Sequence, residues 1–186
     1  MFPSHDREKD HNTRGCRHTW FNRNASRWFR KIATLKHTLE LHPDYQFVIW
    51  IDCDCIFKEK ITIDRIKRKL VKFDTEKECD IVVLKSLRKV VETGFVIFNR
   101  ACCRHSGTDL LNDVFHLYES GDFRKLYRWD DSYAIQKMMK RGKYKVHDIA
   151  GAIDMNNHSD VFKFSLIGPY ITHNKGRHGR EMGIMK

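Results

Sequence analysis

Two aspartates, Asp52 and Asp54, stand one residue apart at the end of the apolar run QFVIWI, residues 46–51. Such a run is typical of a buried strand, and in an extended segment residues i and i+2 project to the same side. Two neighbouring carboxylates can bind one divalent cation, because Mg²⁺ and Mn²⁺ prefer hard oxygen ligands together with phosphate oxygens. The alternative is a turn in which both carboxylates accept hydrogen bonds from backbone amides.

A second pair of acids, Asp130 and Asp131, opens the stretch DDSYAIQKMMKRG. Acids are favoured at the start of a helix, but N-capping accounts for only one of them. We expect Asp130 to cap the helix and Asp131 to remain available as a general base, which takes a proton from a reacting hydroxyl. Glu92, which precedes Gly94 in an apolar stretch, is the other candidate. It could instead bind substrate hydroxyls or be an exposed acid at a strand end.

The elements that must position these acids alternate along the chain. Apolar residues at helical spacing predict helices over residues 26–41, 62–73, 107–120 and 130–142. Apolar runs bounded by turn residues predict strands over residues 46–51, 79–84, 93–99 and 143–149. This alternation indicates an α/β fold of the Rossmann type, with a mostly parallel sheet flanked by helices. In such sheets ligands bind beyond the carboxyl ends of the strands, where Asp52 and Asp54 are expected.

The composition fits one soluble globular domain. The chain has 186 residues, of which 41% are hydrophobic and 32% charged, and its formal net charge is +11. So strong a positive charge favours an anionic partner, either nucleic acid, an acidic membrane surface or a phosphate-bearing small molecule. No run approaches the ~18 apolar residues of a membrane span, and the N-terminus lacks the apolar core of a signal peptide. These features predict a cytoplasmic location, unless the chain is part of a longer protein.

Four motifs resemble those of the GT-A glycosyltransferases. VIWIDCDCIF (48–57), with the helix predicted ahead of it, resembles the family's metal-binding DxD signature. VETGFVIFNR (91–100) resembles the later strand that lines the acceptor side. RWDDSYAIQKMM (128–139) looks like the helix start that often carries the catalytic carboxylate, and YITHNKGRHG (170–179) resembles the C-terminal His-x-Lys-Gly segment. In this order the motifs are similar to small viral or bacterial glycosyltransferases and, more distantly, to yeast-type galactosyl- and mannosyltransferases.

The resemblance implies an enzyme that moves a sugar from a UDP- or GDP-linked donor to a hydroxyl acceptor, such as a glycan. It also implies a GT-A-like domain over residues 26–186, preceded by a polar segment over residues 1–25. Negative charge builds up on the departing diphosphate, and a divalent metal together with nearby cations stabilises it. Mn²⁺ or Mg²⁺ is therefore the implied cofactor, and no nucleic acid partner is expected.

The implied roles fall on residues that match the family's motifs. The metal would be bound by Asp52, Asp54 and His173. The donor diphosphate would be bound by Asn174, Lys175, Gly176 and Arg177. The catalytic carboxylate would be Asp131, with Asp130 and Glu92 as alternatives. A free base at Asp131 favours inversion at the anomeric carbon, although retention stays open.

The chain departs from the family at its start, because residues 1–25 contain no apolar strand that could hold the nucleoside. The nucleotide, the sugar, the acceptor and the activity of this chain on its own therefore stay open. Two other classes of function use the same residues. A metal-dependent nuclease or nucleotidyltransferase would bind nucleic acid in a salt-dependent way. A degenerate transferase would be a non-catalytic module that binds nucleotide or glycan without turnover.

Overall fold

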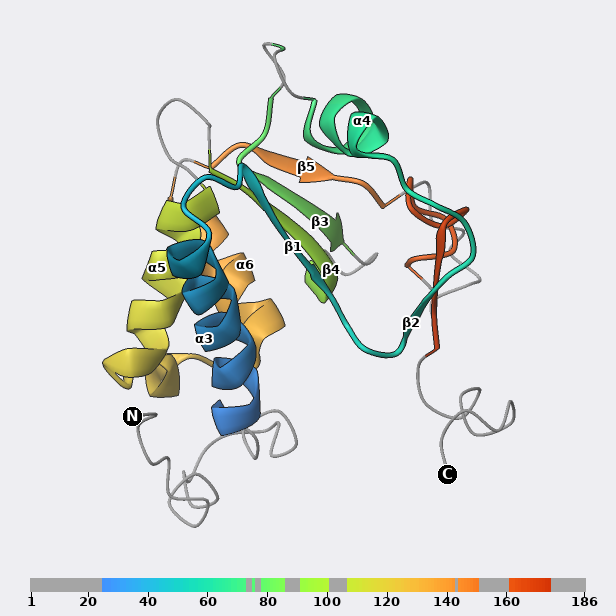
Figure 1. The fold of residues 1–186 in the computed structure, drawn as a ribbon. Helices are drawn as coiled ribbons and strands as arrows, with labels where there is room; N and C mark the ends of the chain where they lie inside the picture. Colours follow the sequence, from blue (N-terminus) through green and yellow to red (C-terminus); the bar gives the residue numbers. More distant parts are fainter. Residues whose placement is uncertain are drawn as a thin grey trace.

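The computed structural model describes residues 25–72, 75, 78–85, 91–100, 107–142, 144–150 and 161–174. These residues form a single α/β domain, in which a central sheet lies between a layer of helices and a smaller layer of turns (Figure 1). The α/β class predicted from the alternation of helices and strands is thus confirmed. Within the described part of the chain, no helix is both long enough and apolar enough to cross a lipid bilayer.

The central sheet has four strands in the order β1 (Phe47–Ile51), β4 (Val91–Asn99), β3 (Ile81–Lys85) and β5 (Val146–Asp148). Strand β4 runs antiparallel to both of its neighbours, whereas β3 and β5 pair in parallel. Strands β1, β3 and β5 therefore point the same way, as a Rossmann-type arrangement requires. The pairing is mixed rather than mostly parallel, because β4 is inserted between β1 and β3 and runs against both.

Three helices cover one face of the sheet (Figure 1): α3 (Ala25–Leu41), α5 (Gly107–Glu119) and α6 (Asp131–Arg141). Each begins and ends within one residue of its predicted bounds. The buried stripe of α3 has helical spacing and consists of Phe29, Ile32, Leu35 and Leu39. These side chains form one core cluster with apolar residues of α5, α6 and the sheet. Burial of this cluster fixes the helical layer against the sheet.

Strand β4 links the two sides of the sheet, because alternate residues of a strand point to opposite faces. Its residues Val96 and Phe98 belong to the helical core cluster. Phe95 and Ile97 belong instead to a second cluster on the other face. A strand buried on both faces explains why this stretch of sequence is a continuous apolar run.

The second face of the sheet is covered by a short helix and by turns. Helix α4 (Ile63–Arg65) continues into a wider π-helical turn, η1 (Ile66–Val71), and turns follow over residues 161–170. The π-helical turn η1 is capped at its C-terminal end by Lys72, whose backbone is left-handed with φ of 58°. The helix predicted over residues 62–73 is therefore present but shorter.

A separate two-stranded ribbon brings the C-terminal motif to the DxD motif. Strand β2 (Cys55–Phe57) pairs antiparallel with β6 (Ile171–His173), and Cys55 lies opposite His173. The ribbon is extended by a hydrogen bond of 2.9 Å from the Asn174 amide to the Asp54 carbonyl. Two segments about 120 residues apart in the sequence thus meet beside the carboxyl end of β1.

Candidate functional site

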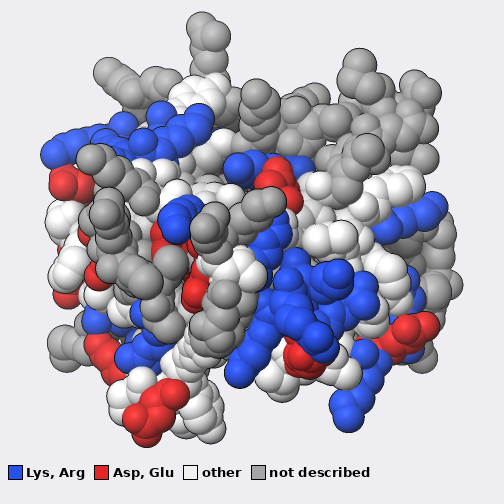
Figure 2. Space-filling model, turned by 90° about the horizontal axis from the view of Figure 1, so that it is seen from above, with Lys and Arg blue, Asp and Glu red and all other residues white. Residues whose placement is uncertain are grey.

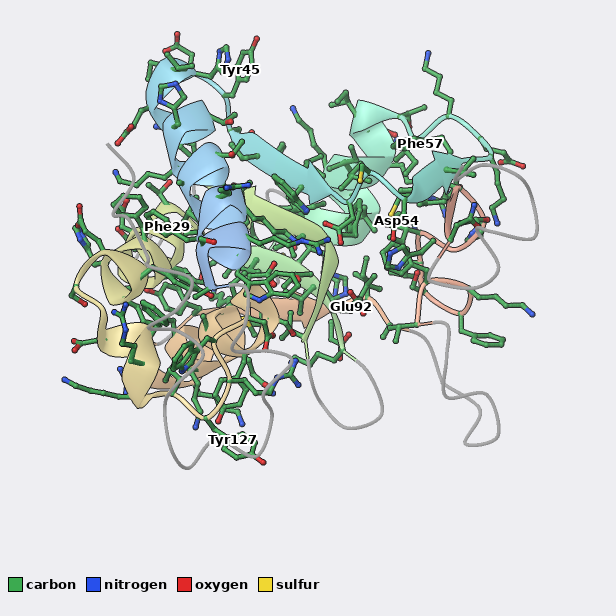
Figure 3. The ribbon with its side chains drawn as sticks, turned by 90° about the horizontal axis from the view of Figure 1, so that it is seen from below. Phe29, Tyr45, Asp54, Phe57, Glu92 and Tyr127 are labelled. Carbon is green, nitrogen blue, oxygen red and sulfur yellow. The ribbon has the colours of Figure 1, made fainter. Side chains whose placement is uncertain are left out.

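A cavity of about 750 Å³ opens at the carboxyl end of β1, at the N-terminal ends of α3 and α6. Six of the predicted site residues line it: Asp52, Asp54, Glu92, Asp130, Asp131 and His173. Figure 3 shows Asp54 and Glu92, which come from different segments of the chain, at the same edge of the sheet. The structure therefore brings together one or more residues from each of the four motifs singled out in the sequence.

The two acids of the DxD motif contact different side chains. The chain leaves the extended conformation after Ile51 and turns at Cys53 and Asp54, with a hydrogen bond of 3.0 Å from the Cys55 amide to the Asp52 carbonyl. The motif is therefore a turn and not the straight extended segment that the sequence predicts. Their carboxylates contact side chains, and not the backbone amides of a turn, within the part of the chain that the structure describes.

Asp54 contacts His173 of the β2–β6 ribbon. The distance from Asp54 Oδ1 to His173 Nε2 is 2.9 Å, and the His173 side chain is only 3% exposed. The imidazole packs on the ring of Phe162, with 4.5 Å between the ring centroids. Gly94 of β4 makes room for both rings, because a Cβ atom at that position would lie 3.1 Å from Phe162 and 3.2 Å from His173.

Asp52 contacts Lys31 of α3, a residue that the sequence analysis missed. Lys31 Nζ lies 3.1 Å from Asp52 Oδ1 and 2.9 Å from Asp131 Oδ2, and it donates a hydrogen bond of 2.5 Å to the Thr93 carbonyl. Asp52 Oδ1 also accepts a hydrogen bond of 2.5 Å from Trp50 Nε1. Lys31 is 9% exposed, so its charge is buried among acids that balance it.

A signal for Lys31 was present in the sequence. Lys31 follows Trp28 by three residues and precedes Leu35 by four, so it lies on the apolar stripe of α3. A lysine on such a stripe must either reach solvent or find counter-charges. Its partners could not be named from the sequence, because they come from β1 and from α6, far away along the chain.

The adjacent acids Asp130 and Asp131 have different surroundings. Asp130 Oδ1 accepts a hydrogen bond of 3.0 Å from the Tyr133 amide, which confirms that Asp130 caps α6. Its other oxygen accepts a hydrogen bond of 2.7 Å from Arg128 Nε. Asp131, which is 3% exposed, is held by Lys31 instead. Both carboxylates line the cavity, but only Asp130 has a structural role that accounts for both of its oxygens.

Glu92 reaches the cavity from the first residues of β4. Its Oε1 accepts a hydrogen bond of 3.3 Å from the Gly94 amide. Strand β4 runs against β1, so the start of β4 lies beside the end of β1. This explains how Glu92 comes to the same cavity as the DxD acids, although some forty residues separate them in the sequence.

The residues around Asp54 fit a divalent metal in spacing and in donor type. Ligand atoms of Asp54, Cys55 and His173 lie within 4.8 Å of one another. Two adjacent ligands of an octahedral Mg²⁺ or Mn²⁺ stand about 3 Å apart, and the Asp54–His173 distance of 2.9 Å matches this. Burial, together with the carboxylates of Asp54 and Asp52, raises the pKa of Cys55 to about 12. A thiol is a soft ligand, which Mg²⁺ and Mn²⁺ disfavour, so the aspartate and the histidine are the suitable pair.

Most of the residues predicted to bind the donor diphosphate cannot be placed. Lys175, Gly176 and Arg177 lie outside the described residues. Asn174 is described, and it is fixed to the DxD turn through its backbone amide rather than lining the cavity. Among the described residues, the cations that line the cavity are Arg27, Arg30, Lys31 and Arg128. The first three come from α3, and none of the four was predicted as a site residue.

Comparison with known proteins supports a glycosyltransferase-like fold. No protein-family model matches the sequence, and a search of curated proteins found no match. The chain is similar in structure to a glycosyltransferase involved in the glycosylation of the major capsid of PBCV-1, with a TM-score of 0.55. The two chains are 13% identical, and the similarity covers 87% of this chain and 78% of that one. At this identity the likeness concerns the fold, which agrees with the fold implied by the four motifs.

Proposed function

We propose that this chain is a glycosyltransferase that moves a sugar from a nucleoside-diphosphate donor to a hydroxyl acceptor. The observation that carries the proposal is the convergence of the four motifs on one cavity of about 750 Å³. The motifs were singled out by their resemblance to one family, and they lie far apart in the sequence. Their meeting at the carboxyl end of β1, in a glycosyltransferase-like fold, is what that family's chemistry requires.

The proposed cofactor is Mn²⁺ or Mg²⁺. Asp54 and His173 would hold the ion, since their ligand atoms already stand 2.9 Å apart. Asp52 lies in the same cavity, but Lys31 and Trp50 contact its carboxylate. A bound divalent ion would neutralise the charge that develops on the departing diphosphate. Arg27 and Arg30 line the same cavity and would meet the negative charge of the donor.

The proposed general base is Asp131. Its Oδ2 lies 2.9 Å from Lys31 Nζ, which gives the carboxylate a fixed orientation at the cavity wall. Asp130 is less suited, because both of its oxygens are engaged by the helix cap and by Arg128. Glu92 faces the same cavity and would bind a hydroxyl group of the donor or acceptor. A base on the acceptor side corresponds to an inverting transfer.

The proposed acceptor is a hydroxyl group of a glycan or glycoprotein. The similar structure belongs to an enzyme involved in the glycosylation of a viral capsid, which supports an acceptor of this kind. The cavity is open and has both polar and apolar walls, among them Trp28 and Trp50. Flat indole rings are suited to packing on a sugar face, whose C–H groups are apolar.

Calorimetric titration of UDP and of GDP, with and without Mn²⁺, tests this proposal. We expect one nucleotide to bind in the presence of Mn²⁺, and we expect the Asp54→Asn variant to lose that binding. Asp64→Asn is the matched control, since Asp64 is an exposed acid on α4 outside the cavity. A folded wild-type protein that binds neither nucleotide would contradict the proposal. Binding without sugar transfer from any donor would identify a non-catalytic module instead.

A further inference from the structure

We propose that the surface formed by α4, η1 and Tyr170 is a second binding site, which docks the protein onto an anionic phospholipid membrane. The surface contains a groove of about 400 Å³ that shares no residue with the catalytic cavity. The groove is lined by Lys60, Thr62, Asp64, Arg65, Arg68, Lys69 and Tyr170. Figure 2 looks down on the α4 side of the molecule and shows lysine and arginine side chains gathered in one patch there. The inference does not depend on the proposed transferase activity.

The charge of this surface follows from how the segment packs. Residues 58–72 contain seven lysines and arginines but only two acids, so this short stretch carries much of the chain's net charge of +11. Ile66, Leu70 and Val71 are buried beneath it, which turns the basic residues outward. One of the acids, Asp64, is already paired with Arg68 along the helix. The groove therefore presents an excess of positive charge.

Apolar side chains protrude beside the cations. Ile63 is 65% exposed and lies between two groove residues, Thr62 and Asp64. Phe57 is 54% exposed, and Ile56, next to it, is 40% exposed. The following residue, Lys58, donates its amide to the Tyr170 carbonyl at 2.7 Å, which joins these apolar side chains to the groove. Large apolar residues are seldom left exposed so close together without a binding role.

Tyr170 lines the groove beside its cations. The Arg65 guanidinium lies over its ring, 4.5 Å from the centroid. Tyrosine has an apolar ring and a polar tip, and is enriched where proteins meet the membrane interface. Lysines and arginines that pair with lipid phosphates, beside aliphatic and aromatic groups that enter the headgroup region, are the two signals that stable surface binding needs.

The apolar component distinguishes a membrane from a nucleic acid. Binding to a polyanion such as RNA uses the cations and flat aromatic stacking surfaces, and gains nothing from exposed isoleucines. Here two of the three protruding side chains are isoleucines. A membrane uses both components, because cations alone give weak and salt-sensitive binding. The mixture of charge and aliphatic surface therefore favours the lipid.

Sedimentation with lipid vesicles tests the proposal. We expect the wild-type protein to bind vesicles of phosphatidylcholine containing about one third phosphatidylserine, and not vesicles of phosphatidylcholine alone. Each basic residue near an anionic membrane is worth roughly a factor of five in partitioning. The triple variant Lys60→Gln/Arg65→Gln/Lys69→Gln should therefore bind on the order of 100-fold more weakly. Failure of the wild type to bind the anionic vesicles, or equal binding by this variant, would overturn the proposal.

Two further variants make the test specific to this surface and to lipid. Lys125→Gln/Lys140→Gln/Arg141→Gln removes the same charge from exposed positions on the helical layer, and should bind within about threefold of wild type because distant charges are screened. Phe57→Ser/Ile63→Ser leaves the charge unchanged and should weaken vesicle binding at least tenfold. A single-stranded RNA oligonucleotide serves as the polyanion probe. If the apolar variant binds vesicles like wild type, or if RNA binds while vesicles do not, the surface is a polyanion site and the lipid assignment is overturned.

Discussion

Lys31 Nζ lies 2.9 Å from Asp131 Oδ2, in a cavity where both side chains are nearly buried. The contact joins the first turns of α3 to the first turn of α6, and the same ammonium group lies 3.1 Å from Asp52 at the end of β1. One buried lysine thus holds an acid from the DxD motif and an acid from the later helix motif. The two motifs are separated by about 75 residues in the sequence, and Lys31 fixes their relative position.

Replacing Lys31 by methionine should destabilise the protein by about 3 kcal/mol, since removal of one partner of a buried ion pair leaves the other charge uncompensated. Chemical denaturation measures this loss. Lys36→Met on the same helix is the matched control: Lys36 is more exposed, its salt bridge is to Glu40, an exposed residue of the next turn, and its ammonium group lies 5.3 Å from the Phe115 ring centroid. The control should cost less than about 1 kcal/mol. Equal losses for the two variants would contradict the role given to Lys31.

Replacing Gly94 by alanine should weaken Mn²⁺ binding by about tenfold, which is the lower end of the effect of residues that orient a metal ligand. The added Cβ atom would press on Phe162 at 3.1 Å and on His173 at 3.2 Å, and would push the imidazole away from Asp54. Calorimetry with Mn²⁺ measures the change. Unaltered Mn²⁺ affinity in a folded Gly94→Ala protein would show that His173 is not a ligand.

Substitutions of the two acids at the start of α6 should have different effects on turnover. Asp131→Asn should lower transferase turnover by 100-fold or more, as loss of a general base does, while nucleotide binding stays within about threefold. Asp130→Asn should keep turnover near wild type but lower stability, because asparagine still caps the helix but leaves the buried Arg128 contact without its charge. Sugar transfer and thermal unfolding measure the two effects. A larger loss of turnover in Asp130→Asn than in Asp131→Asn would reverse the assignment.

Cys55 should resist alkylation, although it lies beside the proposed metal site. Burial and the neighbouring carboxylates raise its pKa to about 12, and only the thiolate reacts. At pH 8 iodoacetamide should modify Cys55 on the order of 100-fold more slowly than the exposed Cys53. Peptide mass spectrometry gives the two rates, and similar rates would contradict the raised pKa of the half-buried Cys55.

The same thiol gives a stability prediction with a definite sign. Its pKa is higher in the folded protein than its ordinary value of 9.0, so the folded state favours the protonated form. This contribution to stability is complete below pH 9 and is lost as the pH rises from about 9 toward 12. A Cys55→Ser variant should lose less stability than wild type over this range in denaturation experiments. Equal losses of stability in the two proteins over this pH range would contradict the prediction.

Local patterns in the sequence were enough to predict the elements and one of the caps. Helical spacing of apolar residues predicted α3, α5 and α6, and Asp130 was identified as the cap of α6, because these features depend on neighbouring residues. The apolar runs likewise predicted β1, β3, β4 and β5. All five acids expected at the site line one cavity at the carboxyl end of β1, which is where ligands bind in such sheets.

What was missed depends on contacts between distant segments. Strand β4 lies between β1 and β3. Which strands pair with one another depends on distant segments, so a local sequence pattern cannot predict it. The turn at Cys53 and Asp54 leads into β2, whose partner β6 comes from a distant part of the chain. Lys31 was overlooked because a charged residue in an amphipathic helix is normally at the surface. Its burial makes sense only once Asp52 and Asp131 lie beside it.

The proposed function is that this cavity transfers a sugar with the help of a divalent metal. The most direct test is the release of UDP or GDP from a panel of sugar nucleotides, with and without Mn²⁺, by the wild type and by Asp54→Asn and Asp131→Asn. We predict that one donor is consumed only when Mn²⁺ is present, and that either substitution lowers the rate 100-fold or more. A folded wild-type protein that consumes no donor, or equal rates in the two variants and the wild type, would contradict the account.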